Sequence, residues 1–282
     1  MTGSRCASSP VPPEQAPVPV QRRLRLRFGK AGKVRFTSHR DVARLWERAL
    51  RRSRLPLSYS QGFVPHPLVS FGLALPTGCE SMGEYLDLRL GAPLPGETPV
   101  EGLPEALSAL LPAGIEVQAA ALVEDTEGSL QQEVASCDWE LEVSGVSSEE
   151  LRQRAEMVLA ATVLTVSRER KGRPVDDDVR PAIRTLSVTD SDGHLRAELA
   201  THPRGIRPID LLAALGADLV LERACRTHQW IERDGARFEP LQVSGLASSV
   251  ALAQNARRAL PHVRAGSQPD PTGSSAGGGL QP

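Results

Sequence analysis

The strongest constraint on the fold is an order of predicted elements that occurs twice along the chain. Each half reads as strand, helix, two strands, helix and strand, although the residues themselves do not repeat. In the 282-residue chain this order fits residues 21–124 and 134–235. A β-α-β-β-α-β order is typical of ferredoxin-like units, each an antiparallel sheet backed by helices. We therefore predict an α+β protein built from two tandem ferredoxin-like units.

Alternation and helix-start signals locate the elements of the first half. Leu24 and Leu26 alternate with arginines, as in a strand with one buried face. Ser38 with Asp41 three residues later is a typical helix start. The predicted elements are a strand over 22–29, an extended segment over 34–36, a helix from Ser38, strands over 68–75 and 84–90, a helix over 98–111 and a strand over 115–123.

Similar signals locate the second half. Ser147 and Glu150 form a capping-box pattern, Asp192 and Gly193 indicate a tight turn, and Pro208 begins a helix. The predicted elements are strands over 139–143, 180–188, 194–200 and 219–231, an extended segment over 162–166, and helices from 147 and over 208–216. Residues 1–20 and the end of the extension 236–282 are rich in Gly, Ser and Pro, so we predict disordered tails.

The composition favours a soluble cytoplasmic protein without a cofactor. No apolar stretch approaches the roughly 20 residues of a membrane-spanning helix. The four cysteines are scattered, which fits reduced thiols better than a disulfide framework. The separations of His39, His66 and Cys79 match no metal-ligand spacing, and we predict no metal site. The acidic run 176–178 reads as part of a charged hairpin.

Positive charge is concentrated near the beginning of the chain. The formal net charge is -1, yet residues 21–60 contain thirteen Arg or Lys against two acids. Clustered cations favour a polyanion such as RNA, because they release counterions from a phosphate backbone. A habitual use of Arg in place of Lys would explain the residue type but not the clustering.

The start of the first predicted helix is a candidate ligand-binding turn. Ser38, His39 and Arg40 could cradle a phosphate at the helix N-terminus, with His39 as a possible proton carrier. Alternatively, Ser38 only caps the helix and His39 is an exposed residue of its first turn.

Further candidates follow along the same third of the chain. Arginines on the polar helix face would follow a phosphate backbone, unless that face is merely solvated. The loop over residues 59–67, which we call the proline-bounded loop, could present Phe63 or His66 to a base. Alternatively, Phe63 could anchor the loop to the core. The predicted nucleic-acid or ligand-binding residues are Arg25, Arg27, Arg35, Ser38, His39, Arg40, Arg44, Arg48, Gly62, Phe63, His66, Glu84 and Tyr85.

Several motifs in the first half resemble one known family. They are VRFTSHRD at 34–41, WERALRR at 46–52, YSQGFVPHP at 59–67, SFGLALP at 70–76 and EYLD at 84–87. Their order and spacing resemble the radical SAM-linked protein family of unknown function (domain of unknown function family 2344). A weaker similarity continues through Lys171-Gly172, 178–181, Arg207-Pro208 and Arg226-Thr227.

The resemblance implies a protein fused to, or encoded beside, a radical SAM protein, often near genes for ribonuclease E/G and ribosomal proteins. This chain has no Cys-x-x-x-Cys-x-x-Cys motif, so radical chemistry would come from a separate protein. The leading hypothesis is an accessory protein that binds RNA or an RNP and has no catalytic activity of its own. Two alternatives stay open: a metal-free endoribonuclease that uses His39, and an adaptor that contacts only protein.

Overall fold

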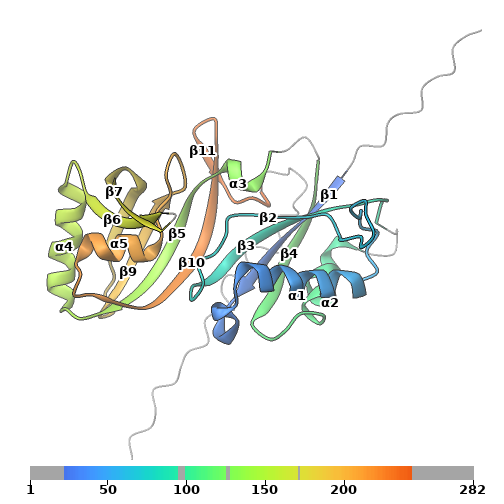
Figure 1. The fold of residues 1–282 in the computed structure, drawn as a ribbon, viewed down its shortest axis with the longest axis horizontal. Helices are drawn as coiled ribbons and strands as arrows, with labels where there is room; N and C mark the ends of the chain where they lie inside the picture. The colour runs from blue at the N-terminus through green and yellow to red at the C-terminus, as the bar shows by residue number, and fades with distance from the viewer. Residues whose placement is uncertain (1–21, 95–98, 125–127, 171, 243–282) are drawn as a thin grey trace, which may run out of the picture. The chain divides into compact units, whose positions relative to one another are not determined.

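The first half of the chain folds into four strands and two α-helices. We describe the chain from a computed structural model that covers residues 22–94, 99–124, 128–170 and 172–242 (Figure 1). The elements, with 3₁₀ helices labelled η, are β1 (Arg22–Lys30), η1 (Gly32–Phe36), α1 (His39–Arg52), β2 (Val69–Phe71), β3 (Glu80–Arg89), η2 (Val100–Gly102), α2 (Leu103–Ser108) and β4 (Ile115–Glu124).

The second half adds the remaining strands and helices. They are α3 (Leu130–Glu133), β5 (Val134–Ser144), α4 (Ser148–Ala160), β6 (Thr165–Arg170), β7 (Arg173–Asp178), η3 (Arg180–Ala182), β8 (Ile183–Val188), β9 (His194–Ala200), α5 (Pro208–Leu215), β10 (Val220–Arg233) and β11 (Ala236–Phe238). The acidic residues 176–178 lie in the β6–β7 hairpin, as predicted. The α+β class is confirmed.

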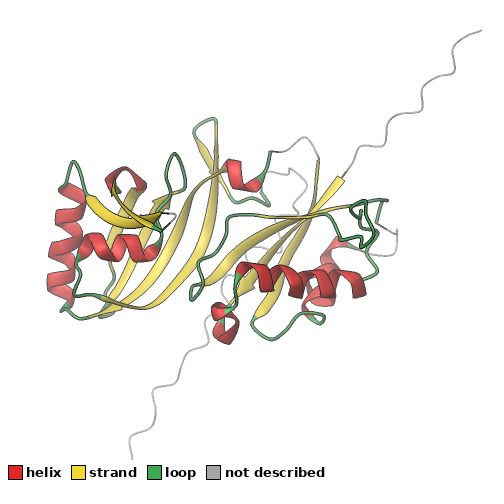
Figure 2. Ribbon diagram, in the orientation of Figure 1, coloured by secondary structure: helices red, strands yellow, loops and turns green. Residues whose placement is uncertain are grey.

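Nine strands join one mixed sheet, and β6 and β7 form a separate two-stranded hairpin (Figure 2). The order of the sheet is β4-β1-β3-β10-β5-β9-β8, with β2 beside β3 and β11 beside β10. Within each half the paired strands are antiparallel. α1 and α2 lie beside the first-half strands, and α4 and α5 lie beside the second-half strands (Figure 2).

The predicted pair of separate antiparallel sheets does not form. Instead β3 and β10 pair in parallel, with Glu80 opposite Cys225 and Ser81 opposite Arg226. This short pairing satisfies backbone groups that would otherwise lie at an open strand edge. The two halves therefore share one sheet.

The predicted strand over 180–188 begins as the 3₁₀ helix η3 and becomes β8 at Ile183. Two local predictions in the first half also differ from the structure. The predicted extended segment over 34–36 is part of the 3₁₀ helix η1. Lys30 Nζ, at the end of β1, donates to the carbonyl oxygens of Arg35 (3.3 Å) and Thr37 (3.0 Å). The predicted strand over 68–75 shortens to β2, because the carbonyl of Leu73 accepts a hydrogen bond from Arg226 Nη2 (2.8 Å) rather than from a neighbouring strand. In both segments a side chain from outside the segment, Lys30 or Arg226, bonds a backbone carbonyl, and strand or helix periodicity does not reveal such a bond.

Each half has its own apolar core. In the first core, Trp46 of α1 packs edge-on against Phe28 of β1, with ring centroids 5.0 Å apart. In the second core, Leu151 of α4 and Leu211 of α5 are fully buried among residues of β5, β8 and β9. These apolar stripes explain why the helices lie on the sheet.

Other sequence expectations concern the cysteines, the membrane and the tails. Cys79, Cys137 and Cys225 are free and buried, as expected for reduced thiols. Within the described ranges, no helix has the length and apolar character needed to cross a bilayer. The predicted disordered tails and the predicted helix start near Thr98 lie outside the described residues.

Candidate functional site

The strand arginines of the predicted interface are ion-pair partners inside the protein, with Arg25 buried and Arg27 half-buried. Arg25 has no solvent exposure, and its Nε and Nη2 donate to the two carboxylate oxygens of Asp87 (2.7 and 2.9 Å). Arg25 Nη1 donates to the carbonyl of Pro240 (3.0 Å), and Arg27 pairs with Glu239 (3.2 Å). Arg25 and Arg27 therefore bind the segment after β11 to the sheet, and neither faces a polyanion from solution.

Arg35 has a mixed position. Its Nη1 lies 3.5 Å from Glu80 Oε1, and its guanidinium lies over the Phe36 ring at 4.8 Å. Glu80 also accepts hydrogen bonds from the Gly32 N–H (2.8 Å) and from Arg223 Nε (2.7 Å). Burial opposes ionisation of Glu80, but these donors outweigh it and lower its pKa below the usual range. Arg35 thus belongs to a structural network that links the two halves.

The helix arginines form an exposed row, which we call the α1 row. Its members are Arg40, Arg44, Arg48, Arg51 and Arg52. Arg52 Nη2 donates to the Leu110 carbonyl (2.5 Å). Two other members have carboxylate partners on the same helix: Arg44 pairs with Asp41 (3.0 Å) and Arg51 with Glu47 (2.8 Å). Exposed pairs of this kind stabilise a fold little, so their guanidinium groups can exchange carboxylates for phosphates.

The turn before α1 serves as a helix cap. Ser38 Oγ accepts from the Asp41 N–H (3.2 Å) and donates to Asp41 Oδ2 (2.7 Å). The Ser38 hydrogen bond lowers the pKa of Asp41. His39 packs edge-on against Phe71, with ring centroids 5.1 Å apart. Among the described residues, no hydrogen-bond partner orients the His39 ring as a general base requires. The capping interpretation of this turn accounts for its contacts.

The proline-bounded loop is fastened to the second half of α1. Arg51 Nη2 donates to the Pro65 carbonyl (2.6 Å), and His66 Nδ1 lies 2.7 Å from Glu47 Oε1. The Arg51 and His66 contacts lower the pKa of Glu47. Phe63, in the middle of this loop, is fully exposed, so it does not anchor the loop to the core. The structure thus holds this loop, with its exposed aromatic ring, against the second half of α1.

Gly62 allows the loop to turn. Its φ of 149° lies in a region that side chains rarely adopt, and open space surrounds it. Its predicted contribution to ligand contact is therefore conformational.

Glu84 and Tyr85 lie inside the protein. Arg226 Nε donates to Glu84 Oε1 (3.0 Å), and Arg226 Nη2 donates to Glu84 Oε2 (2.7 Å). Tyr85 is buried, which raises its pKa, and its hydroxyl has no hydrogen-bond partner among the described residues. Glu84, Tyr85, His39 and Lys30 line one small hollow of about 20 Å³. This space suits a single water-sized group. Three of the predicted residues, His39, Glu84 and Tyr85, therefore line one hollow, which is too small for a larger ligand.

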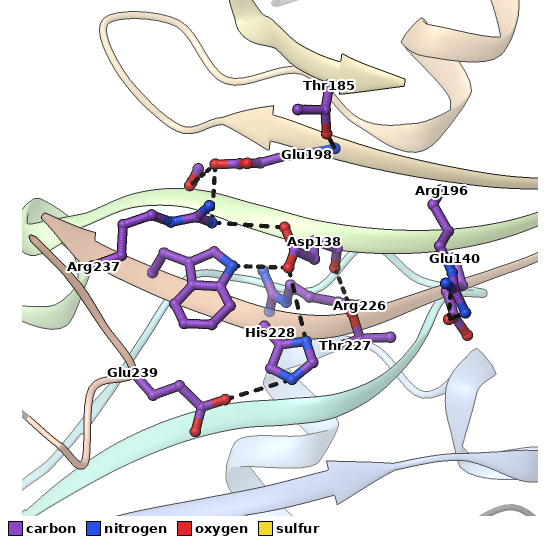
Figure 3. Close-up of polar contacts among 12 residues, drawn as sticks. Asp138, Glu140, Thr185, Arg196, Glu198, Arg226, Thr227, His228, Arg237 and Glu239 are labelled. Carbon is purple, nitrogen blue, oxygen red and sulfur yellow. Dashed lines mark hydrogen bonds and ion pairs between the residues drawn. The ribbon is translucent and has the colours of Figure 1, made fainter. Parts of the chain in front are cut away.

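Sequence reasoning missed a polar cluster on β5, β10 and β11. The Trp230 ring contacts two side chains. The His228 ring is stacked on it, with ring centroids 5.3 Å apart, and the Arg237 guanidinium carbon lies 4.5 Å from the Trp230 centroid. Asp138 accepts from Trp230 Nε1 (2.9 Å), and Glu239 lies 3.7 Å from His228 (Figure 3). No local spacing could reveal this cluster, because register between distant strands assembles it. The Trp230 ring is therefore already in contact with His228 and Arg237.

Arg226 is the other functional candidate that the sequence concealed. It enters the sequence analysis only as part of the weaker family resemblance, yet it is 2% exposed and connects both halves through Glu84 and Leu73. A buried cation at a sheet junction has no sequence pattern of its own.

The thiols and carboxylates of the described residues offer no metal centre. No three His, Cys, Asp or Glu side chains in these parts of the chain gather closely enough to hold an ion. Burial raises the pKa of Cys137 to about 11 and that of Cys225 to about 12, so both thiols are protonated at pH 7.

Comparison with known families now identifies the sequence type. A family model described as an uncharacterised protein conserved in bacteria, DUF2344, matches residues 23–208. The chain belongs to the DUF2344 family. Residues 23–208 include α1, the proline-bounded loop and α4, but end at the first residue of α5. No curated protein matches the chain in sequence. Membership of the DUF2344 family does not define an activity.

Proposed function

We propose that this DUF2344 protein binds RNA, alone or within an RNP, through the α1 row and the neighbouring loop, and serves as an accessory to a separate radical SAM protein in the cytoplasm. One observation carries the RNA proposal. The contacts of Arg51 with Pro65 and of His66 with Glu47 hold an exposed aromatic ring beside a row of exposed arginines.

Electrostatics favours the helix over the other basic residues. The side chains of Arg44 and Arg51 are 56% and 41% exposed, whereas that of Arg25 is fully buried. Guanidinium groups at successive turns match the spacing needed to follow a phosphate backbone. Their neutralisation of phosphates would release counterions, so the affinity is expected to fall steeply with salt.

The loop would supply contact with a base. Phe63 is exposed on a segment whose ends are bridged by Tyr59 and Pro67. Stacking on an aromatic side chain tolerates any base, because every base has a π-face. The α1 row and Phe63 together would favour single-stranded or looped RNA over a duplex.

The radical SAM partner rests on the family resemblance and on the absence of a cluster-binding cysteine motif in this sequence. The accessory protein would present RNA, and the partner would supply the chemistry. Its contacts with that partner would lie outside the α1 row if both are bound together.

The test is RNA binding at increasing salt, with Arg44→Glu compared with Arg152→Glu. Arg152 is a matched control, because it also lies on a helix and pairs with a carboxylate three residues earlier. Arg44→Glu should weaken binding and reduce the slope of log affinity against log salt by about 1, while Arg152→Glu changes neither.

Absent or salt-insensitive RNA binding would refute the proposal. If Arg44→Glu spares RNA binding but breaks a complex with a protein, the adaptor alternative is correct. RNA cleavage by the wild type that His39→Ala abolishes would favour the nuclease alternative instead.

We also propose that the sheet consists of two ferredoxin-like units joined edge to edge. The support is the strand order, β4-β1-β3-β2 in one half and β10-β5-β9-β8 in the other, with a helix after the first and third strand of each unit. In this description β6 and β7 are an insertion in the second unit. The α1 row then belongs to the first unit and Arg226 to the last strand of the second.

A further inference from the structure

A larger hollow adjoins the small one that His39 lines, since Leu73 lines both. Its volume is about 180 Å³, and it lies between the segment after β2, the strands β5 and β9, and the start of α5. Its walls are mostly apolar. They include Ala74, Cys137, Trp139, Leu199, Ile206 and Pro208.

Arg226 contributes the charged group of this hollow. Its hydrogen bonds to Glu84 and to the Leu73 carbonyl use Nε and Nη2. Neither contact uses Nη1, and Arg226 lines the hollow together with Cys137, whose thiol also interacts with the guanidinium. Because Glu84 neutralises the guanidinium, Nη1 offers hydrogen-bond donors without a strong net charge. The hollow therefore favours a neutral ligand that presents an acceptor.

The size and the walls restrict the ligand further. A cavity of about 150 Å³ lined by apolar side chains accommodates one benzene ring. A hollow of about 180 Å³ thus suits a single six-membered ring. Trp139 provides an aromatic surface at the wall, with the Arg226 guanidinium 5.7 Å from its ring centroid. A flat heteroaromatic ring would keep such a surface in contact and fill the space.

We propose that this hollow, the Arg226 pocket, binds a pyrimidine base whose ring carbonyl oxygen accepts a hydrogen bond from Arg226 Nη1. Uracil and cytosine both carry such an oxygen on a single ring. Adenine has two fused rings and no carbonyl oxygen. A guanidinium has donors and no acceptor, so it distinguishes ligands by the acceptors that they present.

The base could be free or part of RNA, and only the second source rests on the proposed function. An extruded nucleotide is compatible with the position of the pocket, because Leu73 separates it from the hollow beside His39 at the start of α1. A strand that follows the α1 row could therefore place one base there. A free nucleoside would need neither the α1 row nor Phe63.

The first experiment measures uridine and adenosine binding by calorimetry on the full chain. Uridine carries no phosphate, so the α1 row does not contribute to its affinity. Ala74→Phe should block the pocket without disturbing the core, because Ala74 is exposed at its wall. Ala106→Phe is the matched control, an exposed alanine of α2 away from the pocket. Wild type and control should bind uridine at least about tenfold more tightly than adenosine, and Ala74→Phe should lose this uridine binding.

The second experiment compares short oligouridine with oligoadenosine at one salt concentration. A preference for oligouridine that Ala74→Phe removes, with no binding of free uridine, supports the pocket and assigns the base to RNA. Uridine binding that Ala74→Phe abolishes, with no RNA binding at all, supports the pocket while the RNA proposal falls. The inference is overturned if the wild type distinguishes neither the nucleosides nor the oligonucleotides, or if Ala74→Phe retains the distinction.

Discussion

The arginines of β1 and those of α1 are close in sequence but have opposite roles. Arg25 and Arg27 lie in a strand face that the segment after β11 covers, and each has a carboxylate partner from a distant part of the chain. Arg44 and Arg51 lie on a helix face open to solvent, and their partners are three and four residues away. The comparison shows that a cluster of charge in a sequence does not define a surface. Among the described residues, the arginines of α1 are open to an external polyanion, whereas Arg25 is not.

The physical reason is what covers each element. Side chains of a strand alternate between two faces, and in β1 one face packs against α1 while the other carries Arg25, which donates to the Pro240 carbonyl after β11. A surface helix has one apolar stripe and leaves its opposite face in water. The same residue type is therefore buried with a partner in one element and exposed in the other.

The largest effect on folding is expected for Arg25→Met. Removal of the guanidinium leaves Asp87 buried beside an apolar group, with Arg23 as its remaining cationic partner (3.1 Å). Loss of one member of a buried pair costs about 3–5 kcal/mol of unfolding free energy. Urea unfolding would measure this, with Arg48→Met as the exposed control. Equal midpoints for the two variants would remove the distinction between strand and helix.

A smaller effect should appear as pH dependence at Glu80, which is linked to Arg223 and Arg35. Because its folded pKa is lowered, its contribution to stability is present above the unfolded value of about 4.3 and is lost as the pH falls through the folded pKa. The wild type should therefore lose stability below about pH 4.3 more steeply than Glu80→Gln. Unfolding free energies measured across this range would test it, and parallel curves would contradict it.

A loss of about 1 kcal/mol is expected for Ser38→Ala, which removes the N-cap of α1. The exposed row would keep its charge, so RNA affinity of the folded protein should not change. Thermal unfolding and RNA titration on the same samples would separate the two roles of this turn. A marked loss of RNA affinity without a loss of stability would show that Ser38 contacts the ligand.

The smallest effect on folding is expected for Arg44→Ala, since its pair with Asp41 is exposed to solvent. Its unfolding midpoint should equal that of the wild type within error, whereas its RNA affinity should fall. Urea unfolding and filter binding would provide the two measurements. If Arg44→Ala lowers stability and leaves RNA affinity unchanged, Arg44 has a structural role like that of Arg25, and the distinction between strand and helix arginines fails.

Local patterns predicted the elements well where one periodicity and one cap were sufficient. The alternation around Leu24 and Leu26 predicted β1, and Ser38 with Asp41 predicted the start of α1. The extended segment over 34–36 failed, because hydrogen bonds from Lys30 determine η1. For the candidate site, the proximity of the proline-bounded loop to the α1 row matched expectation, but Arg226 and the Trp230 cluster could not be found from spacing.

The sequence by itself determined the α+β class, the positions of β1 and α1 and the exposed arginines of the first helix, because these depend on periodicity, capping and turn residues close in the chain. Tertiary structure decided that β3 and β10 join the halves into one sheet, that Arg25 is neutralised inside it, and that Arg226 lines a hollow. Strand register brings residues more than a hundred positions apart into contact, and no local pattern encodes which partner each buried charge will meet.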